Sequence, residues 1–118
     1  VECVDHIDTA EEMVVGMASG NFNLITLERQ VDPQLMRYTA VHEAGHAWAF
    51  SILDQAAMDA LVAQVGGTAW DGWGTTYRSN VTESFANAFA SCRGYGSMDY
   101  LPMDCDVMDA ALTAAATR

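Results

Sequence analysis

The pattern of hydrophobic and polar positions predicts strands in the first quarter of the chain. Residues 1–7 alternate weakly, and residues 23–28 are rich in β-branched and aliphatic side chains, so we expect a strand in each range. Residues 9–18 leave two alternatives open. Thr9 and Glu12 have the spacing of a capping box, which favours a short helix, whereas an apolar run before a Ser-Gly-Asn turn favours a strand.

Four helices are predicted along the rest of the chain. The first begins at Asp32-Pro33, where a capping residue precedes a proline at the first helical position, and continues to about Leu53. The others are expected over about residues 56–65, 80–91 and 104–116. The apolar positions of the first helix that are available for the core are Leu35, Met36, Val41, Ala44, Trp48 and Ile52.

Composition and charge limit the possible partners. The chain has 118 residues, of which 51% are hydrophobic, and this is enough for one domain spanning residues 1–118. Sixteen acidic and five basic residues give a net charge of −11, which would repel a phosphate backbone and an anionic membrane. No apolar run approaches the roughly 20 residues of a membrane helix. We therefore expect no nucleic-acid partner and no membrane partner.

The three cysteines, Cys3, Cys92 and Cys105, cannot all pair within one chain. Cys92 and Cys105 are separated by a segment with two glycines and a proline, which allows the chain to double back. A bridge between them would stabilise the fold by roughly 3 kcal/mol and would indicate a secreted, extracellular protein. The alternative is three buried free thiols in a cytosolic protein. Cys3 is left without an assigned partner.

The candidate chemistry lies in the first predicted helix. His42 and His46 are four residues apart, so on a helix their side chains lie on one face, one turn apart, and both can reach one tetrahedral zinc ion. Glu43 lies about 100° around the helix from His42, where it can act on a zinc-bound water without being a ligand. The small residues between the histidines allow another backbone to approach closely. The alternative is a helix with two surface or core-edge histidines and a solvated glutamate.

A catalytic zinc site needs a third protein ligand and leaves its fourth position to water. His6, the only other histidine of the sequence, is interpreted as a surface residue, so two acidic candidates remain, Asp71 and Glu83. Two phenylalanines in the helix of Glu83 would bury against the core and turn this carboxylate towards the metal. Asn87, one turn further on, could hydrogen-bond a metal ligand. Alternatively, Glu83 is an acid favoured by the helix dipole at a helix start.

The segment His-Glu-Ala-Gly-His at residues 42–46, followed by Glu83 within Glu-x-Phe-Ala-x-Ala-Phe, resembles the gluzincin metallopeptidases. It is most similar to very small gluzincins and to the catalytic domains of lethal-factor-type toxin proteases, and the similarity covers about residues 35–91. In those domains a tyrosine several residues before the glutamate faces the zinc, and Tyr77 has this position here. The chain departs from the pattern at Asn87, where such families commonly carry a second acid.

A second resemblance involves residues 67–74, Gly-Thr-Ala-Trp-Asp-Gly-Trp-Gly, which are similar to the Gly-Thr-x-Asp-x-x-Tyr-Gly motif of the deuterolysin-type aspzincins. The aspartate of that motif is the third zinc ligand, so the resemblance implies Asp71 as a rival to Glu83. Asp71 falls one position later than in the motif, and Trp73 replaces the tyrosine. Without a metal role, this segment is expected to form an ordered loop that packs under the active-site helix.

The gluzincin resemblance implies a compact, zincin-like α+β domain in which a small mixed or antiparallel sheet accompanies an active-site helix and a second helix with a metal ligand. It also implies a zinc metalloendopeptidase. His42, His46 and Glu83 would bind Zn²⁺. Glu43 would act as the general base on the attacking water, and Tyr77 would assist the oxyanion.

The resemblance further implies how substrate is held. In zincins the strand before the metal helix lies at the sheet edge and pairs with extended substrate, and residues 23–28 would have this role here. We expect a peptide or an unfolded protein as substrate, an inhibitor or pro-segment as a further partner, and a monomer. Trp48, Trp70 and Trp73 are expected either in the core or along the cleft. The alternative function is a zinc-stabilised binding module that hydrolyses nothing.

Overall fold

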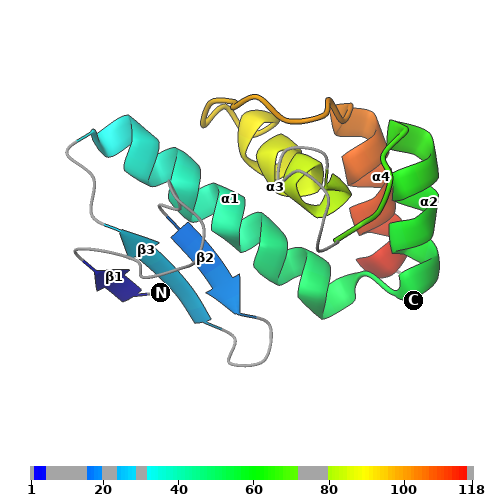
Figure 1. Cartoon of the computed structure of the whole chain (residues 1–118), viewed down its shortest axis with the longest axis horizontal. Coiled ribbons are helices and arrows are strands. Elements are labelled where there is room, and N and C mark those ends of the chain that lie inside the picture. Colours follow the sequence, from blue (N-terminus) through cyan, green and yellow to red (C-terminus); the bar gives the residue numbers. More distant parts are fainter. Residues whose placement is uncertain (1, 5–15, 20–23, 29–31, 72–79, 117–118) are drawn as a thin grey trace.

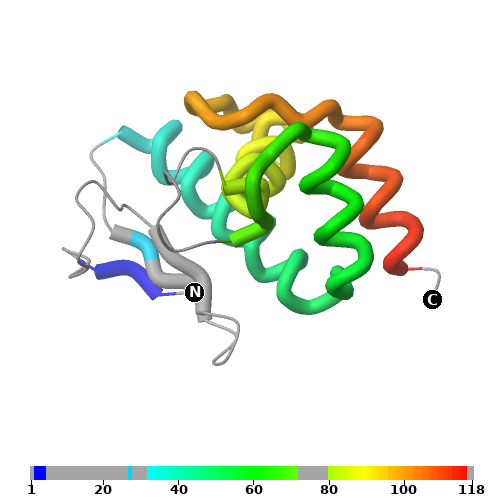
Figure 2. The backbone as a smooth tube through the Cα atoms, turned by 45° about the vertical axis from the view of Figure 1, so that its right-hand side comes forward, coloured from blue at the N-terminus to red at the C-terminus, as the bar shows by residue number. Residues whose placement is uncertain are grey.

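The structure, a computed structural model, describes residues 2–4, 16–19, 24–28, 32–71 and 80–116. Its elements are β1 (Glu2–Val4), β2 (Gly16–Ser19), β3 (Leu24–Glu28), α1 (Pro33–Ile52), α2 (Gln55–Val65), α3 (Val81–Ser91) and α4 (Cys105–Ala116). The sheet lies on one side of α1 and α3 lies on the other, while α2 and α4 gather near the C-terminal end of α1 (Figure 1). β1 and the end of α4 lie at opposite ends of the molecule (Figure 2). Within the described ranges, no helix is both long and apolar enough to span a membrane.

The predicted α+β fold class is wrong, because the described residues are mostly helical. The four helices contain 20, 11, 11 and 12 residues, whereas the strands contain 3, 4 and 5. The buried hydrophobic cluster consists of residues from the helices and from the cap of α1, and its members are Ala49, Leu53, Leu61, Val81, Phe85, Ala88, Phe89 and Met108. The core is therefore built by helices, and the short strands are an addition on one side of α1 rather than a principal layer.

The three strands pair in the order β1-β3-β2, with β1 parallel and β2 antiparallel to β3. Glu2 and Met17 both pair with Thr26, from opposite sides of β3. The strand predicted within residues 23–28 is confirmed as β3, but its predicted position at a sheet edge is wrong. Because β1 and β2 cover both of its edges, β3 has no free edge with which an extended substrate could pair.

Near the N-terminus, the structure decides part of the choice that the sequence left open. Residues 16–19 form β2, which agrees with a strand in the second half of the segment 9–18. Residues 9–15 lie outside the described ranges. The strand expected within residues 1–7 is present as β1.

The helix boundaries agree with the capping signals in the sequence. At the start of α1, the Asp32 side chain accepts a hydrogen bond of 2.9 Å from the Gln34 amide, and Pro33 is the first helical residue. Asp54 caps α2 in a similar way. α2 ends at Gly66, whose φ of 78° is strained for residues with a Cβ. The four predicted helices are thus confirmed almost to the residue.

The inward side of α1 is only partly the apolar face that the sequence indicated. Its buried residues are Tyr38, Thr39, His42, Glu43, Gly45, His46 and Ala49. Of the apolar positions expected in the core, Val41, Ala44 and Ile52 are partly buried and pack against the hydrophobic cluster. Trp48, which we expected in the core or along a cleft, is 51% exposed. α1 packs against the sheet and against α3, and α3 is buried from Val81 to Ala90. The candidate functional side chains are therefore enclosed between helices.

Trp70 and Trp73 are the other tryptophans that we expected in the core or along the cleft. Trp70 is half-buried, and its ring centroid lies 5.8 Å from that of Phe85, so it packs against the core as one of the two alternatives predicted. Trp73 lies outside the described residues.

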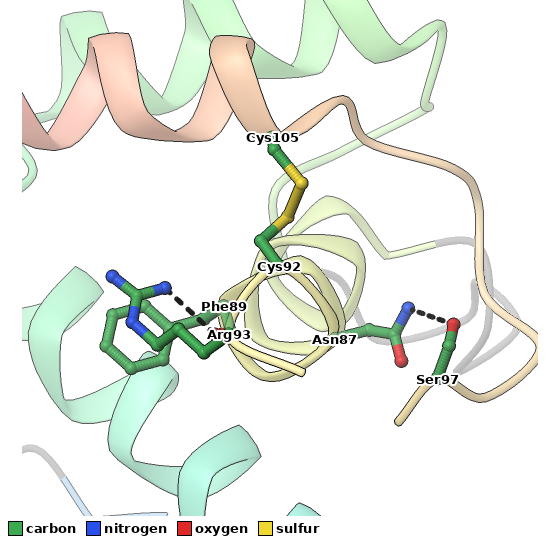
Figure 3. Close-up of a disulfide and its surroundings, with 6 residues drawn as sticks. All are labelled: Asn87, Phe89, Cys92, Arg93, Ser97 and Cys105. Atoms are coloured by element: carbon green, nitrogen blue, oxygen red, sulfur yellow. Dashed lines mark hydrogen bonds between the residues drawn. A yellow bond between two sulfur atoms is a disulfide. The ribbon is translucent and has the colours of Figure 1, made fainter. Parts of the chain in front are cut away.

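A disulfide links the end of α3 to the start of α4. Cys92 and Cys105 are bonded, with their Cα atoms 5.7 Å apart, which confirms the predicted pairing. Cys3 is an exposed free thiol. The bridge closes residues 93–104 into a loop that returns past α3, where Ser97 lies beside Asn87 (Figure 3).

Candidate metal centre

Two helices bring three potential metal ligands together. His42 and His46 lie one turn apart on α1, and Glu83 lies in the first turn of α3. The Nε2 atom of His42 is 3.2 Å from Oε2 of Glu83, and the Nε2 atom of His46 is 2.9 Å from Oε1 of Glu83. One ligand atom from each residue lies within 4.8 Å of those of the other two. The structure therefore contains a possible metal-binding triad made of the three predicted ligands.

Close packing of α1 against α3 encloses this triad. Its three residues are only 4–8% exposed. The helices approach closely beside Gly45, which lies between the two histidines, and a Cβ atom at this position would be 2.9 Å from the Cβ of Phe89. The predicted close approach at the small residues of the motif is confirmed at Gly45.

The second ring nitrogen of His42 faces a chain of hydrogen-bonded side chains. Its Nδ1 is 3.2 Å from the hydroxyl oxygen of Tyr38, and that hydroxyl donates to Oδ1 of Asn87 over 2.6 Å. The rings of Tyr38 and Tyr100 also lie against His42, with centroids 5.6 and 5.7 Å from its own. Asn87 was predicted to hydrogen-bond a metal ligand, but it reaches His42 only through Tyr38.

The second ring nitrogen of His46 is also engaged. Its Nδ1 is 3.2 Å from the hydroxyl oxygen of Thr82, which precedes Glu83 on α3. One turn of α3 therefore supplies both Glu83 of the possible triad and the hydroxyl that lies beside the ring of His46. Because both Nδ1 atoms have partners, both histidines turn Nε2 towards Glu83, which is the orientation that binding through Nε2 requires.

Burial and hydrogen bonding shift the pKa values of the triad. Burial acts to raise the pKa of Glu83, but the ring nitrogens of His42 and His46 beside its two oxygens outweigh this and lower it to about 2. Burial lowers the pKa of His42, although Glu83 opposes the shift. Burial also acts to lower the pKa of His46, but the hydrogen bond and the negative charge of Glu83 raise it. At neutral pH the site therefore holds an ionised carboxylate beside two imidazole rings.

Glu43 follows His42 on α1 and is 4% exposed. Burial raises its pKa to about 7; the charge of His46 opposes this shift and the charge of Glu83 adds to it. A carboxyl group with such a pKa can accept and release a proton near neutral pH, which is what a general base needs.

The remaining predicted site residues are not part of the described triad. Asp71 is exposed and lines an open pocket of about 500 Å³, together with Trp70 and with Asp59 of α2. Its charge contributes to the raised pKa of His46, but less than Glu83 and Glu43 do. Tyr77 and His6 lie outside the described residues.

Three residues at the site were not anticipated. Tyr38 lies four residues before His42 on the same face of α1, so its position follows from helix periodicity. Thr82 is adjacent to Glu83 and follows from the same helix. Tyr100 belongs to the loop between α3 and α4, and no local pattern in the sequence relates it to α1.

A scan against protein-family models, a search of curated proteins and a search of solved structures found no match to this chain. The comparisons therefore show no family for this chain, and the observation left is the possible metal-binding triad of His42, His46 and Glu83. A proposal for its function has to be argued from the chemistry of that site.

Proposed function

We propose that the protein is a zinc metalloendopeptidase of the gluzincin type, with His42, His46 and Glu83 as the metal ligands. The observation that carries the proposal is the convergence of two imidazole nitrogens on one carboxylate between two helices, with each nitrogen 2.9–3.2 Å from one of the carboxylate oxygens. Two histidines and one glutamate form the ligand set of one class of catalytic zinc sites, and they leave a position for water or substrate.

The spacing of the donor atoms supports zinc. Ligand atoms about 2.0–2.1 Å from a tetrahedral ion are about 3.3 Å apart, which compares with 3.2 Å between His42 and Glu83 and 2.9 Å between His46 and Glu83. Nitrogen and carboxylate donors in a four-coordinate arrangement are typical of zinc rather than of calcium or magnesium. When bound, zinc would lower the pKa of a coordinated water from 15.7 to about 7 and polarise a substrate carbonyl.

Glu43 is the proposed general base. It accepts a proton from the attacking water and passes it to the leaving amine, so that it ends the cycle as it began. The raised pKa of Glu43, about 7, supports this role because the group can change its protonation state at neutral pH. Tyr77 stays the predicted hydrogen-bond donor to the oxyanion.

The proposed substrate is a flexible peptide or an unfolded protein. The triad is 4–8% exposed, so an extended segment can reach it more easily than the surface of a folded protein. We also propose that the protein is exported, and the Cys92–Cys105 disulfide supports this because such bonds persist in oxidising compartments.

Metal content tests the ligand assignment. Wild-type protein purified without added metal should contain one zinc ion per chain by elemental analysis. The Glu83→Ala variant should lose this zinc, and the matched Asp71→Ala variant should retain it. If only the Asp71→Ala variant loses zinc, the aspzincin-type assignment is correct and the gluzincin-type assignment is wrong.

Peptide hydrolysis tests the catalytic assignment. The Glu43→Gln variant should keep its zinc and lose about 10²- to 10⁴-fold in turnover, which is the usual contribution of a general base. Turnover equal to that of the wild type would exclude Glu43 as the base.

A second candidate function is a binding module in which zinc only stabilises the fold. The low exposure of the triad favours this candidate, since structural zinc sites are closed to solvent. A wild-type protein that holds zinc and cleaves no peptide in a broad unstructured substrate would support the module over the peptidase.

A further inference from the structure

The side-chain amide of Asn87 has only one orientation that fits its surroundings. Its Oδ1 accepts a hydrogen bond of 2.9 Å from the backbone N–H of Met98, and its Nδ2 donates to the hydroxyl of Ser97 over 3.2 Å (Figure 3). A backbone N–H can only donate, so the opposite orientation would set two donors against each other. The loop between α3 and α4 therefore fixes which end of this amide faces α1.

This orientation decides the direction of the next hydrogen bond. Oδ1 of Asn87 lies 2.6 Å from the hydroxyl of Tyr38 and can only accept, so Tyr38 directs its single proton there. The hydroxyl oxygen of Tyr38 then presents only lone pairs to Nδ1 of His42, which is 3.2 Å away. A hydrogen bond at this position requires the proton to be on Nδ1 of His42.

The consequence appears on the other side of the ring. With its proton on Nδ1, a neutral His42 presents a lone pair at Nε2, and this atom lies 3.2 Å from a carboxylate oxygen of Glu83. Two electron-pair donors at this distance repel each other unless a cation lies between them. The hydrogen-bonded chain thus favours the form of His42 that binds a metal and disfavours the form in which Nε2–H bonds Glu83.

We propose that Tyr38 and Asn87 are positioning residues that hold His42 in the tautomer that binds metal through Nε2, and that the backbone of Met98 sets their direction. This inference rests on the proposed metal site and deepens it. We call the hydrogen bonds that run from Met98 through Asn87 and Tyr38 to His42 the relay. The Cys92–Cys105 disulfide joins the ends of the loop that carries Met98, so the relay connects His42 to this disulfide-closed loop.

The tautomer of His42 tests the relay directly. Long-range ¹H–¹⁵N correlation spectra of metal-free protein at pH 8 distinguish Nδ1–H from Nε2–H, and the chain has only three histidines to assign. The wild type should carry Nδ1–H at His42. Tyr38→Phe and Asn87→Leu should shift His42 towards Nε2–H. Ser97→Ala is the matched control, because it removes a partner of Asn87 without removing the Oδ1 acceptor, and it should keep the wild-type tautomer.

Metal affinity gives the second measurement. Tyr38→Phe and Asn87→Leu should bind Zn²⁺ about 10- to 100-fold more weakly than the wild type in a chelator competition, as is usual when a hydrogen-bond partner of a metal ligand is lost. Asn87→Asp keeps an acceptor oxygen for both Tyr38 and Met98, so it should restore most of the affinity that Asn87→Leu loses. Co²⁺ titrations should give the same order.

The experiments distinguish a failure of the proposed metal site from a failure of the relay. A wild-type protein that binds neither Zn²⁺ nor Co²⁺ would refute the proposed metal site itself. A wild-type protein that binds zinc, but carries Nε2–H at His42 when metal-free, would refute the relay and leave the site intact. Equal affinities for the wild type and a folded Tyr38→Phe variant would refute the relay in the same way, and this conservative variant keeps the test valid if Asn87→Leu does not fold.

Discussion

Gly45 on α1 and Ala86 on α3 approach so closely that a Cβ atom on Gly45 would lie 3.1 Å from the Cα of Ala86. Rotation of a side chain cannot relieve this contact, because the Ala86 atom belongs to the backbone. Gly45 stands between His42 and His46, and Ala86 is less than one turn from Glu83. The missing side chain at Gly45 therefore sets the distance between α1 and α3, the helices that carry the possible metal-binding triad.

The Gly45→Ala variant should be less stable than the wild type. Overpacking of a tight contact costs about 1–3 kcal/mol, and the helix-forming preference of alanine over glycine, about 1 kcal/mol, offsets only part of this. Zinc affinity should fall as well, since separating the helices moves Glu83 away from His42 and His46. Urea unfolding and chelator competition measure the two effects. Stability at or above that of the wild type would contradict the close helix contact.

Glu43 should make the metal-free protein less stable as the pH rises. Its pKa is raised from 4.5 to about 7 in the folded state, so its stabilising contribution is complete below pH 4.5 and is lost as the pH rises towards 7. This difference in pKa corresponds to a loss of about 3 kcal/mol. Glu43→Gln should therefore raise the free energy of unfolding at pH 8 and have little effect at pH 4.

Unfolding in urea with EDTA at both pH values measures this difference. Asp109→Asn, at an exposed position of α4, is the control and should leave the pH dependence of the wild type in place. Parallel stability curves for the wild type and Glu43→Gln would contradict the buried, titrating carboxyl group.

Zinc should stabilise the fold, because the ligands come from two different helices. At a free zinc concentration 1,000 times the Kd, binding adds about 4 kcal/mol, which corresponds to a rise in Tm of roughly 15 °C. Thermal melts with zinc and with EDTA should differ by this amount for the wild type and for Asp71→Ala. A zinc-dependent rise that persists in Glu83→Ala would mean that the stabilising ion binds elsewhere.

Removal of the disulfide should affect both stability and metal binding. The Cys92→Ser, Cys105→Ser double variant should lose about 3 kcal/mol of stability from the released loop. It should also bind zinc more weakly, because Met98 is no longer held against Asn87. In a Tyr38→Phe background the same double substitution should cause no further loss of affinity. Cys3→Ser, which removes the exposed free thiol, should change neither quantity.

The sequence predicted the possible metal-binding triad from one local pattern and one resemblance. Helix periodicity places His42 and His46 on one face, and the capping residue Asp32 fixes where that helix begins. The third residue was left open between Asp71 and Glu83, and the resemblance to gluzincins favoured Glu83. The convergence of the three side chains depends on the packing of α1 against α3, which is a long-range contact.

The sequence predictions that were wrong or missing have a common physical cause, because each depends on contacts between segments that are distant in the chain. Trp48 looked like a core residue but is 51% exposed, whereas α1 buries polar residues such as His46, whose burial depends on partners from other elements, such as Glu83. The order of the strands could not be predicted from the sequence either, since β1 could pair with either of two strands that follow it and it pairs with β3 rather than with β2. The contacts of Tyr100 and Met98 depend on where a loop returns, which no local pattern encodes.

Among the described elements, α1 is the only helix that contacts the strands, and it also contacts α3 along the site (Figure 1). Within the part of the chain that the structure describes, a displacement of β2 or β3 would be passed to His42 and His46 through α1. Both imidazoles would move together with α1, whereas the Glu83 carboxylate belongs to α3. A shift of α1 against α3 would therefore change the separation between the histidine pair and Glu83.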